Sequence, residues 1–155
     1  MSPTDKKKST LFKFLSIFSV VRIYNVLLII LAQYLTSIFI LSDKNFIEVI
    51  FDFNLFLLIL CSSISIASGY IINNFYDEKK DIINKPIKYK IDDVVKSSTK
   101  INFYFILNFI VVIFASFISI RAIIFFVIYI FFLWLYSHKL KRTLLIGNLF
   151  YSILT

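Results

Sequence analysis

Long apolar stretches separated by short polar segments make up most of the chain. A helix needs about 20 apolar residues to cross a hydrocarbon core roughly 30 Å thick; three stretches reach that length and a fourth comes close to it. Their approximate bounds are 16–41, 53–72, 101–120 and 122–137, with a turn before the last so short that those two must form a helical hairpin. A fifth stretch begins near residue 144 and is too short to cross a bilayer by residue 155. We therefore expect an all-α, polytopic transmembrane helix bundle with four full spans and the start of a fifth.

Composition supports a membrane protein. Of 155 residues, 59% are hydrophobic, and the mean hydropathy of +0.86 exceeds what a soluble chain of this length could bury. The net charge of +8 would suggest nucleic acid in a soluble protein. Here the basic residues lie between apolar stretches, so we expect no nucleic-acid partner. The single cysteine, Cys61, lies within an apolar stretch and is expected to be a small packing residue.

The positions of the basic residues predict how the spans are oriented. Lysine and arginine gather in residues 1–15, 79–100 and 139–142, which alternating spans place on one side of the membrane. The opposite side receives residues 42–52, with three acids and one lysine. Because lysine and arginine remain with cytoplasmic loops, we predict a cytoplasmic amino terminus that begins with a basic leader. In a bacterium the membrane would be the inner, or plasma, membrane.

The second span ends in a dense polar cluster, GYIINNFYDEKKDIINKP at residues 69–86. Asn73, Asp77 and Asp81 recur at i, i+4 and i+8, so a helix that continues past the span places them on one face. Such oxygens suit Mg²⁺, which takes one or two carboxylates and completes its shell with water and phosphate oxygens. The plainer interpretation is a solvated loop, since charged residues that follow a span are usually exposed.

Two further polar groups fall at the same level of the bundle. They are Arg22 and Asn25 near the start of the first span, and Lys139, Lys141 and Arg142 after the fourth. Convergence of these groups on the acidic stripe would supply the cations that a departing diphosphate requires. Alternatively, Arg22 could snorkel to the headgroups and the later cations could only enforce topology. We interpret Asp92 and Asp93 as solvated loop residues.

Taken together, these motifs resemble those of the UbiA family of intramembrane prenyltransferases. The cluster that begins at Asn73 resembles the family's first aspartate-rich motif, N-D-x-x-D-x-x-x-D with a trailing proline. VRIYN at 21–25 and LYSHKLKRTLLIGN at 135–148 resemble the family's first helix and its fourth-to-fifth helix connection. Asn74 stands where the family usually has its first aspartate. On a helix this position is turned about 100° away from Asn73.

The resemblance implies Mg²⁺-dependent transfer of a prenyl group from a polyprenyl diphosphate to a lipid or aromatic acceptor within the bilayer. Asn73, Asp77 and Asp81 would bind the metal, and Asp77 and Asp81 would be the catalytic carboxylates. The diphosphate would be bound by Arg22, Asn25 and Lys141, with Lys139 or Arg142 as alternatives to Lys141. LYSHKLKR at 135–142 and the trailing INKP at 83–86 are most similar to the branch that alkylates geranylgeranylglyceryl phosphate, and quinone-ring acceptors remain open.

Family members have more helices and a second aspartate-rich motif, which residues 1–155 do not contain. The resemblance therefore implies that this chain is the amino-terminal half of a UbiA-type domain, with a carboxy-terminal half supplied elsewhere. The alternative is a non-catalytic protein, either a truncated remnant or a partner subunit. A small transporter is a third possibility, favoured least because Arg22 is the one charge placed within a span.

Overall fold

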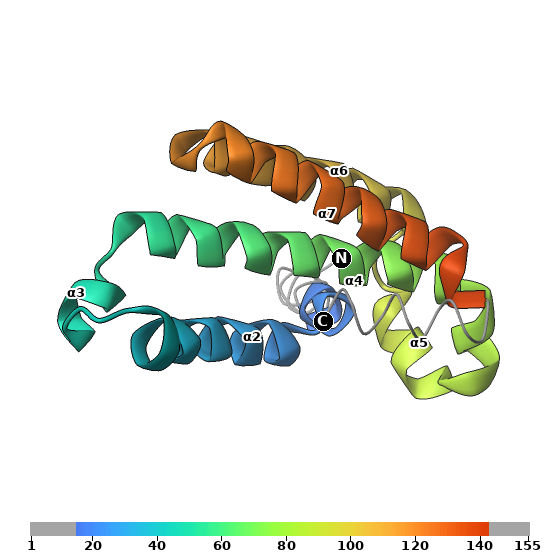
Figure 1. The fold of residues 1–155 in the computed structure, drawn as a ribbon. Coiled ribbons are helices and arrows are strands. Elements are labelled where there is room, and N and C mark those ends of the chain that lie inside the picture. The colour runs from blue at the N-terminus through green and yellow to red at the C-terminus, as the bar shows by residue number, and fades with distance from the viewer. Residues whose placement is uncertain (1–14, 143–155) are drawn as a thin grey trace, which may run out of the picture.

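The structure is a computed structural model that describes residues 15–142. Helices account for its regular structure, and no β-strand occurs within that range (Figure 1). Residues 15–21 are helical, and the elements after them are α2 (Ile23–Thr36), η1 (Ser37–Leu41), α3 (Phe46–Ile50), α4 (Phe53–Asn84), α5 (Pro86–Asp92), α6 (Ser97–Ile118), α7 (Ile120–His138) and η2 (Leu140–Arg142). The predicted all-α fold class is confirmed. The predicted fifth span lies outside the described residues.

Four helical segments are long and apolar enough to cross a membrane: α2 with η1, α4, α6 and α7. They correspond to the four spans expected from hydropathy. The connection between α6 and α7 is Ser119 alone, as the short predicted turn requires. Its Oγ accepts a hydrogen bond from the backbone N–H of Ala122 at 3.1 Å and so caps α7. The predicted helical hairpin is therefore present.

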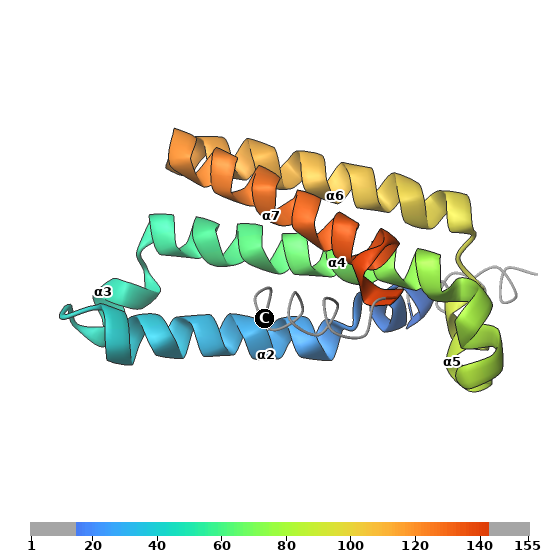
Figure 2. The same cartoon turned by 45° about the vertical axis from the view of Figure 1, so that its right-hand side comes forward.

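The helix α4 lies in the middle of the bundle, with α2 on one side and the α6–α7 hairpin on the other (Figures 1 and 2). In its most apolar stretch 50% of residues are buried, against 6% in α2 with η1 and 17% in each of α6 and α7. Its 32 residues extend over about 48 Å, well beyond a hydrocarbon core of roughly 30 Å. The helix therefore continues past the predicted span and carries its polar end out of the apolar layer.

Small residues allow the neighbouring helices to approach α4 closely. Cys61, Ser65 and Gly69 repeat at i, i+4 and i+8, and Cys61 and Ser65 are fully buried. A Cβ atom added at Gly69 would lie 3.2 Å from Cδ1 of Leu133 on α7. This is the small-xxx-small pattern that lets membrane helices pack without a hydrophobic driving force. Cys61 packs against Val111 of α6, which confirms its predicted role as a small packing residue.

The first predicted span is wrong in one respect, because it is not a continuous helix. Its backbone breaks at Arg22, where φ is 54° and ψ is 53°, the left-handed region that non-glycine residues rarely adopt. Figure 1 shows residues 15–21 nearly end-on, while α2 lies across the view. The last turn of this span, η1, is π-helical. The break directs residues 15–21 toward the polar end of α4.

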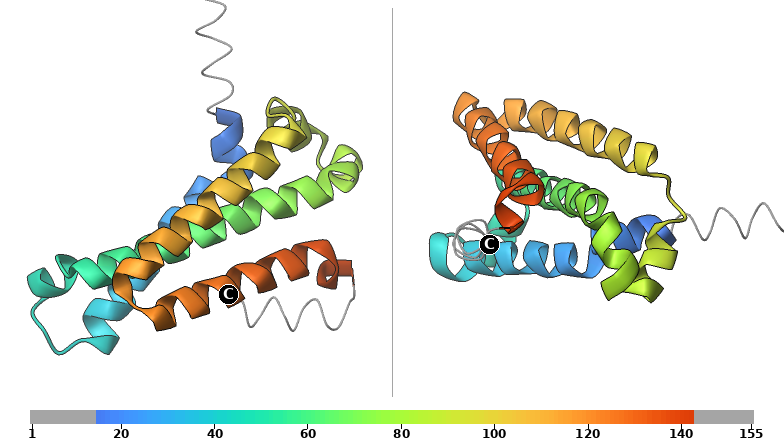
Figure 3. Two further views of the ribbon diagram at one scale, coloured as in Figure 1. Left: turned by 90° about the horizontal axis from the view of Figure 1, so that it is seen from above. Right: turned by 90° about the vertical axis from the view of Figure 1, so that its right-hand side faces the viewer.

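We call the end of the bundle formed by residues 15–22, 77–100 and 138–142 the basic end. Figures 1 and 3 place α5 and the end of α7 there, whereas α3 and the α6–α7 turn lie at the opposite end. This arrangement brings the three polar groups of the sequence to one end of the molecule.

Candidate functional site

A small polar cavity of about 50 Å³ lies at the basic end, where residues 20–22, α4, α5 and η2 meet. It is lined by Val20, Arg22, Tyr70, Asn73, Asn74, Asp77, Asp81, Lys85, Lys88 and Lys141. Most of these side chains are polar or charged, in a bundle whose other surfaces are largely apolar. The cavity is therefore the place where the described part of the chain could bind a charged ligand.

Two oxygens of α4 point at one cation in this cavity. The Lys141 ammonium donates to Oδ1 of Asn73 at 3.0 Å and forms an ion pair with the Asp77 carboxylate. The Asp77 side chain is 15% exposed, so its charge is largely shielded from water and depends on this partner. Asp81, one turn further along the helix, lines the same cavity. The spacing expected from the sequence therefore places Asn73, Asp77 and Asp81 along one wall.

This set of oxygens fits a hard divalent cation that keeps part of its shell for substrate. No group of three or more His, Cys, Asp or Glu side chains is placed to hold a metal within residues 15–142. Mg²⁺, however, is commonly held by one or two carboxylates, with phosphate oxygens and water as its other ligands. The Lys141 ammonium shows that Asn73 and Asp77 already converge on a single positive charge. The chemistry of the donors, two carboxylates and an amide oxygen, is compatible with that metal.

Arg22 and Asn25 both contact the Tyr70 side chain, Arg22 at its ring and Asn25 at its hydroxyl. The Arg22 guanidinium lies 5.1 Å from the ring centroid, a cation–π contact, and Arg22 lines the cavity. The Asn25 amide donates to the Tyr70 hydroxyl at 3.4 Å, and Asn25 does not line the cavity. The left-handed backbone of Arg22 costs about 1 kcal/mol or more. A strained residue at the rim of a polar cavity is typical of functional sites.

An aromatic stack fixes the end of α7 against α4. The rings of Trp134 and His138 are stacked at 5.3 Å, and His138 meets Tyr76 edge-on at 5.0 Å. This contact holds the start of η2 near α4, so that Lys141 reaches Asn73 and Asp77. Lys139 is exposed and does not line the cavity. The side chain of Arg142 lies outside the described part of the chain.

Several lining residues were not expected from the sequence: Tyr70, Asn74, Lys85 and Lys88. Tyr70 precedes Asn73 by three positions, so the helical spacing that pointed to Asn73 could also have indicated Tyr70. The lysines follow α4 in a segment without periodicity, where pattern gives no indication of which side chains turn inward. Whether these lysines line the cavity depends on how α5 folds.

The prediction that Asp92 is solvated is wrong. The side chain is buried, and it accepts hydrogen bonds from the Ser19 hydroxyl and the Asn74 amide, each at 2.7 Å. It also forms an ion pair with Lys88. The reason is that residues 86–92 form a helix, α5, that folds back against α4 (Figure 2). Asp93 is exposed, as expected.

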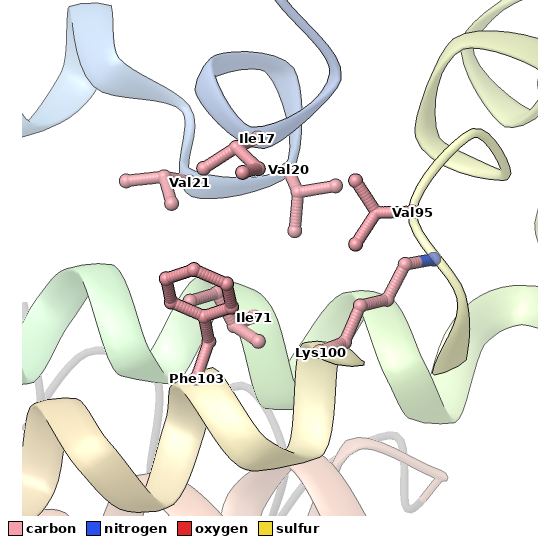
Figure 4. A pocket seen from close by; sticks show the side chains of 7 residues that line it. All are labelled: Ile17, Val20, Val21, Ile71, Val95, Lys100 and Phe103. Carbon is pink, nitrogen blue, oxygen red and sulfur yellow. The ribbon is translucent and has the colours of Figure 1, made fainter. Parts of the chain in front are cut away.

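A second, apolar crevice of about 20 Å³ lies next to this cavity (Figure 4). It is lined by Ile17, Val20, Val21, Ile71, Val95, Lys100 and Phe103. The stem of Lys100 runs along it, and that side chain is only 3% exposed. A space of this size holds no more than a water-sized group, so it is a packing gap between residues 15–21, α4 and α6.

Comparison with known proteins agrees with the geometry. The model of the UbiA prenyltransferase family matches residues 34–155, which is well over half of the chain. The fold is also similar to a solved structure of digeranylgeranylglyceryl phosphate synthase, with a TM-score of 0.73 and 26% sequence identity. That similarity covers 92% of this chain and 49% of the other, so this chain spans about half the length of the synthase. No curated protein matches the chain. With four helices suited to a bilayer and this family match, the chain is an integral membrane protein that belongs to the UbiA prenyltransferase family.

Proposed function

We propose that this chain takes part in the transfer of a prenyl group from a polyprenyl diphosphate to an acceptor within the bilayer. The observation that carries the proposal is the meeting of Asn73 and Asp77 with Lys141 in a polar cavity at one end of an apolar bundle. A polyprenyl diphosphate matches this arrangement, because it has a charged head and a long apolar chain. Membership of a prenyltransferase family supports this reading.

In this proposal the cavity holds the diphosphate head. Asn73, Asp77 and Asp81 would hold Mg²⁺, which neutralises charge on the leaving diphosphate when it is bound. Arg22 and Lys141 would donate to phosphate oxygens and favour breakage of the carbon–oxygen bond by stabilising the departing anion. The acceptor would then form the new bond to the prenyl carbon and lose its proton to the departing diphosphate, while the apolar helices would keep water from competing with it.

Lys141 would change partners when the substrate arrives. In the structure its ammonium neutralises Asp77 and also bonds Asn73. A bound diphosphate offers it a stronger anion, which would release both α4 oxygens for the metal. Without substrate, the Lys141 ammonium would thus pair with the Asp77 carboxylate, and with substrate it would help to bind the diphosphate. Asn25 would act through Tyr70, Lys139 would reach the phosphate only if the end of α7 shifted, and Arg142 stays an alternative to Lys141.

We also propose that the basic end faces the cytoplasm and that residues 1–155 form the amino-terminal half of a UbiA-type domain, with residues 1–15 as a basic leader. The excess of lysine at this end supports the orientation. The 49% coverage of the solved synthase supports the domain assignment. The name of that neighbour favours a geranylgeranylglyceryl phosphate acceptor over a quinone ring. The second candidate is a non-catalytic protein, either a truncated remnant or a partner subunit.

A transfer assay distinguishes these possibilities. The chain, in lipid nanodiscs, is incubated with geranylgeranyl diphosphate, Mg²⁺ and either geranylgeranylglyceryl phosphate or an aromatic acceptor, and products are identified by mass spectrometry. A parallel reaction includes the polypeptide encoded downstream of Thr155. We expect transfer with Mg²⁺ in at least one of these reactions and none with EDTA. Absence of product in both would contradict the enzymatic role and favour a non-catalytic subunit.

A further inference from the structure

Asp92 is a buried carboxylate that lies outside the acidic stripe of α4. It is 2% exposed and has three polar partners: Ser19 in the first helical segment, Asn74 on α4 and Lys88 on α5. A buried carboxylate is strongly unfavourable unless its oxygens are paired. Here the pairing joins α5 to the first helical segment, 73 positions away, and to α4. Asp92 is therefore a junction on which their relative position depends.

One of these partners also lines the polar cavity. Lys88 lies one helical turn before Asp92, and it shares the cavity with Asn73 and Asp77. Its side chain is 28% exposed, so it remains open to a ligand. An ammonium group has three N–H donors, and the contact with Asp92 uses one of them. The others are free to bind an anion in the cavity.

A second contact ties the same connection to α4. The Ser97 hydroxyl at the start of α6 donates to the Glu78 carboxylate at 3.0 Å. Asn74 and Glu78 are four residues apart, so they lie on one face of α4, next to the face that carries Asn73 and Asp77. The connection between α4 and α6 is thus fastened to α4 at Asn74, through Asp92, and again at Glu78.

We propose that Asp92 is a positioning residue that fastens α5 to α4 and thereby holds Lys88 at the cavity, where Lys88 is a further phosphate-binding residue. The phosphate-binding part rests on the proposed function, because it takes the ligand of the cavity to be a diphosphate. The fastening of α5 does not depend on that function. Lys88 would add a cation to Arg22 and Lys141 in a cavity that Lys85 also lines.

In the Asn74–Asp92 hydrogen bond Asn74 is the donor and Asp92 the acceptor, and this assignment can be tested. Asn74 gives its amide N–H to Asp92, while its Oδ1 is buried without a hydrogen-bond partner in residues 15–142. An aspartate at position 74 would set one buried carboxylate against another, which is unfavourable. An asparagine at position 92 would place its amide beside that of Asn74, and it would leave the Lys88 ammonium without a negatively charged acceptor. The pair therefore requires one amide and one carboxylate.

A double-mutant cycle tests the fastening. Hydrogen exchange of residues 85–96 is measured in nanodiscs for Asp92→Asn, Asn74→Asp, the double variant that exchanges the two side chains, and the control Asp93→Asn. Each single change is expected to speed exchange about tenfold or more, and the double variant to return within about threefold of wild type. The control removes the same charge one residue away and should leave exchange unchanged. Equal exchange in wild type and Asp92→Asn, or no recovery in the double variant, would overturn the proposal.

Binding of inorganic diphosphate with Mg²⁺ tests the role of Lys88. Lys88→Gln and Asp92→Asn are each expected to weaken binding about tenfold, because both remove the ammonium from its place at the cavity. Lys88→Gln keeps an N–H donor beside Asp92, and the Ser19 and Asn74 partners remain, so this variant is compatible with folding even where changes at Asp92 are not. Wild-type affinity for both variants would overturn the phosphate-binding part. Absence of binding by the wild type would contradict the proposed function and this part together, and the exchange cycle would still decide whether Asp92 fastens α5.

Discussion

The two halves of α4 are held in place by different kinds of interaction. Before Gly69 the helix buries small side chains such as Cys61 and Ser65, and close packing dominates its contacts, with a hydrogen bond from Ser68 to Asn108 beside it. After Gly69 it still buries Ile71, but it also carries Asn73 and Asp77, whose contacts are hydrogen bonds and an ion pair. The first half should therefore respond to changes in side-chain volume, and the second to changes in charge.

The second half contains a further division between two adjacent faces. Asn73 and Asp77 face the cavity and meet the cation of Lys141, whereas Asn74 and Glu78 face the connection that contains α5 and meet side chains of that connection. We propose that a polar cluster that looks like a solvated loop in the sequence serves two purposes. One face would offer oxygens to a ligand, and the other would secure the segment that borders the cavity.

The largest effect on ligand binding is expected when a negative charge is removed from the face of α4 that borders the cavity. Removal of the same charge from the adjacent face should have little effect. Asp77→Asn should weaken Mg²⁺-dependent binding of geranylgeranyl diphosphate at least about 100-fold, because it removes a carboxylate from the metal set. Glu78→Gln removes the same charge one residue away and keeps an acceptor for Ser97, so affinity should stay within about threefold. Isothermal titration in nanodiscs measures both. Equal losses in the two variants would mean that net charge matters and position on the helix does not.

A change in volume tests the first half. Gly69→Val should lower the free energy of unfolding by about 1–3 kcal/mol, because its side chain would be forced against Leu133. Gly69→Ala adds a single carbon near the flexible end of Leu133 and should cost clearly less. Thermal unfolding in detergent, followed by circular dichroism, compares the two. If valine is tolerated as well as alanine, α4 and α7 do not depend on this close approach.

A smaller effect is expected at the junction of the two halves, where Tyr70 supports Arg22. Tyr70→Leu removes the ring under the guanidinium and should weaken diphosphate binding about three- to fivefold, in line with a cation–π contact of about 1 kcal/mol. Tyr70→Phe keeps the ring and loses only the hydroxyl that meets Asn25. It should bind nearly as well as wild type. A greater loss with phenylalanine than with leucine would assign the effect to the hydroxyl.

The smallest effect concerns the polar contact between α4 and α6 inside the apolar layer. Ser68 donates to Asn108 at 2.8 Å. A double-mutant cycle with Ser68→Ala and Asn108→Leu should give a coupling of about 0.6 kcal/mol, the size usual for hydrogen bonds between membrane helices. Unfolding in mixed micelles supplies the four free energies. A coupling indistinguishable from zero would show that packing alone joins these helices.

The spans and the acidic stripe could be predicted because each depends on local spacing. Apolar length gives the four helices, and the i, i+4, i+8 pattern places Asn73 and Asp77 on one face. The break at Arg22 could not be predicted, because its left-handed backbone accompanies a contact with Tyr70 on another helix. Burial of Asp92 depends on partners 18 and 73 positions away in the sequence. Such long-range pairs leave no periodic signal in a single chain.

Binding of a metal diphosphate in the polar cavity can be tested by one titration. Geranylgeranyl diphosphate is added to the wild-type chain in nanodiscs at a series of Mg²⁺ concentrations, and affinity is measured at each. If Asn73 and Asp77 hold a metal that also contacts the diphosphate, affinity should rise about tenfold or more from EDTA to saturating Mg²⁺, since the two ligands then bind cooperatively. An affinity that does not change with Mg²⁺, or no saturable binding at any concentration, would contradict a metal diphosphate site in this cavity.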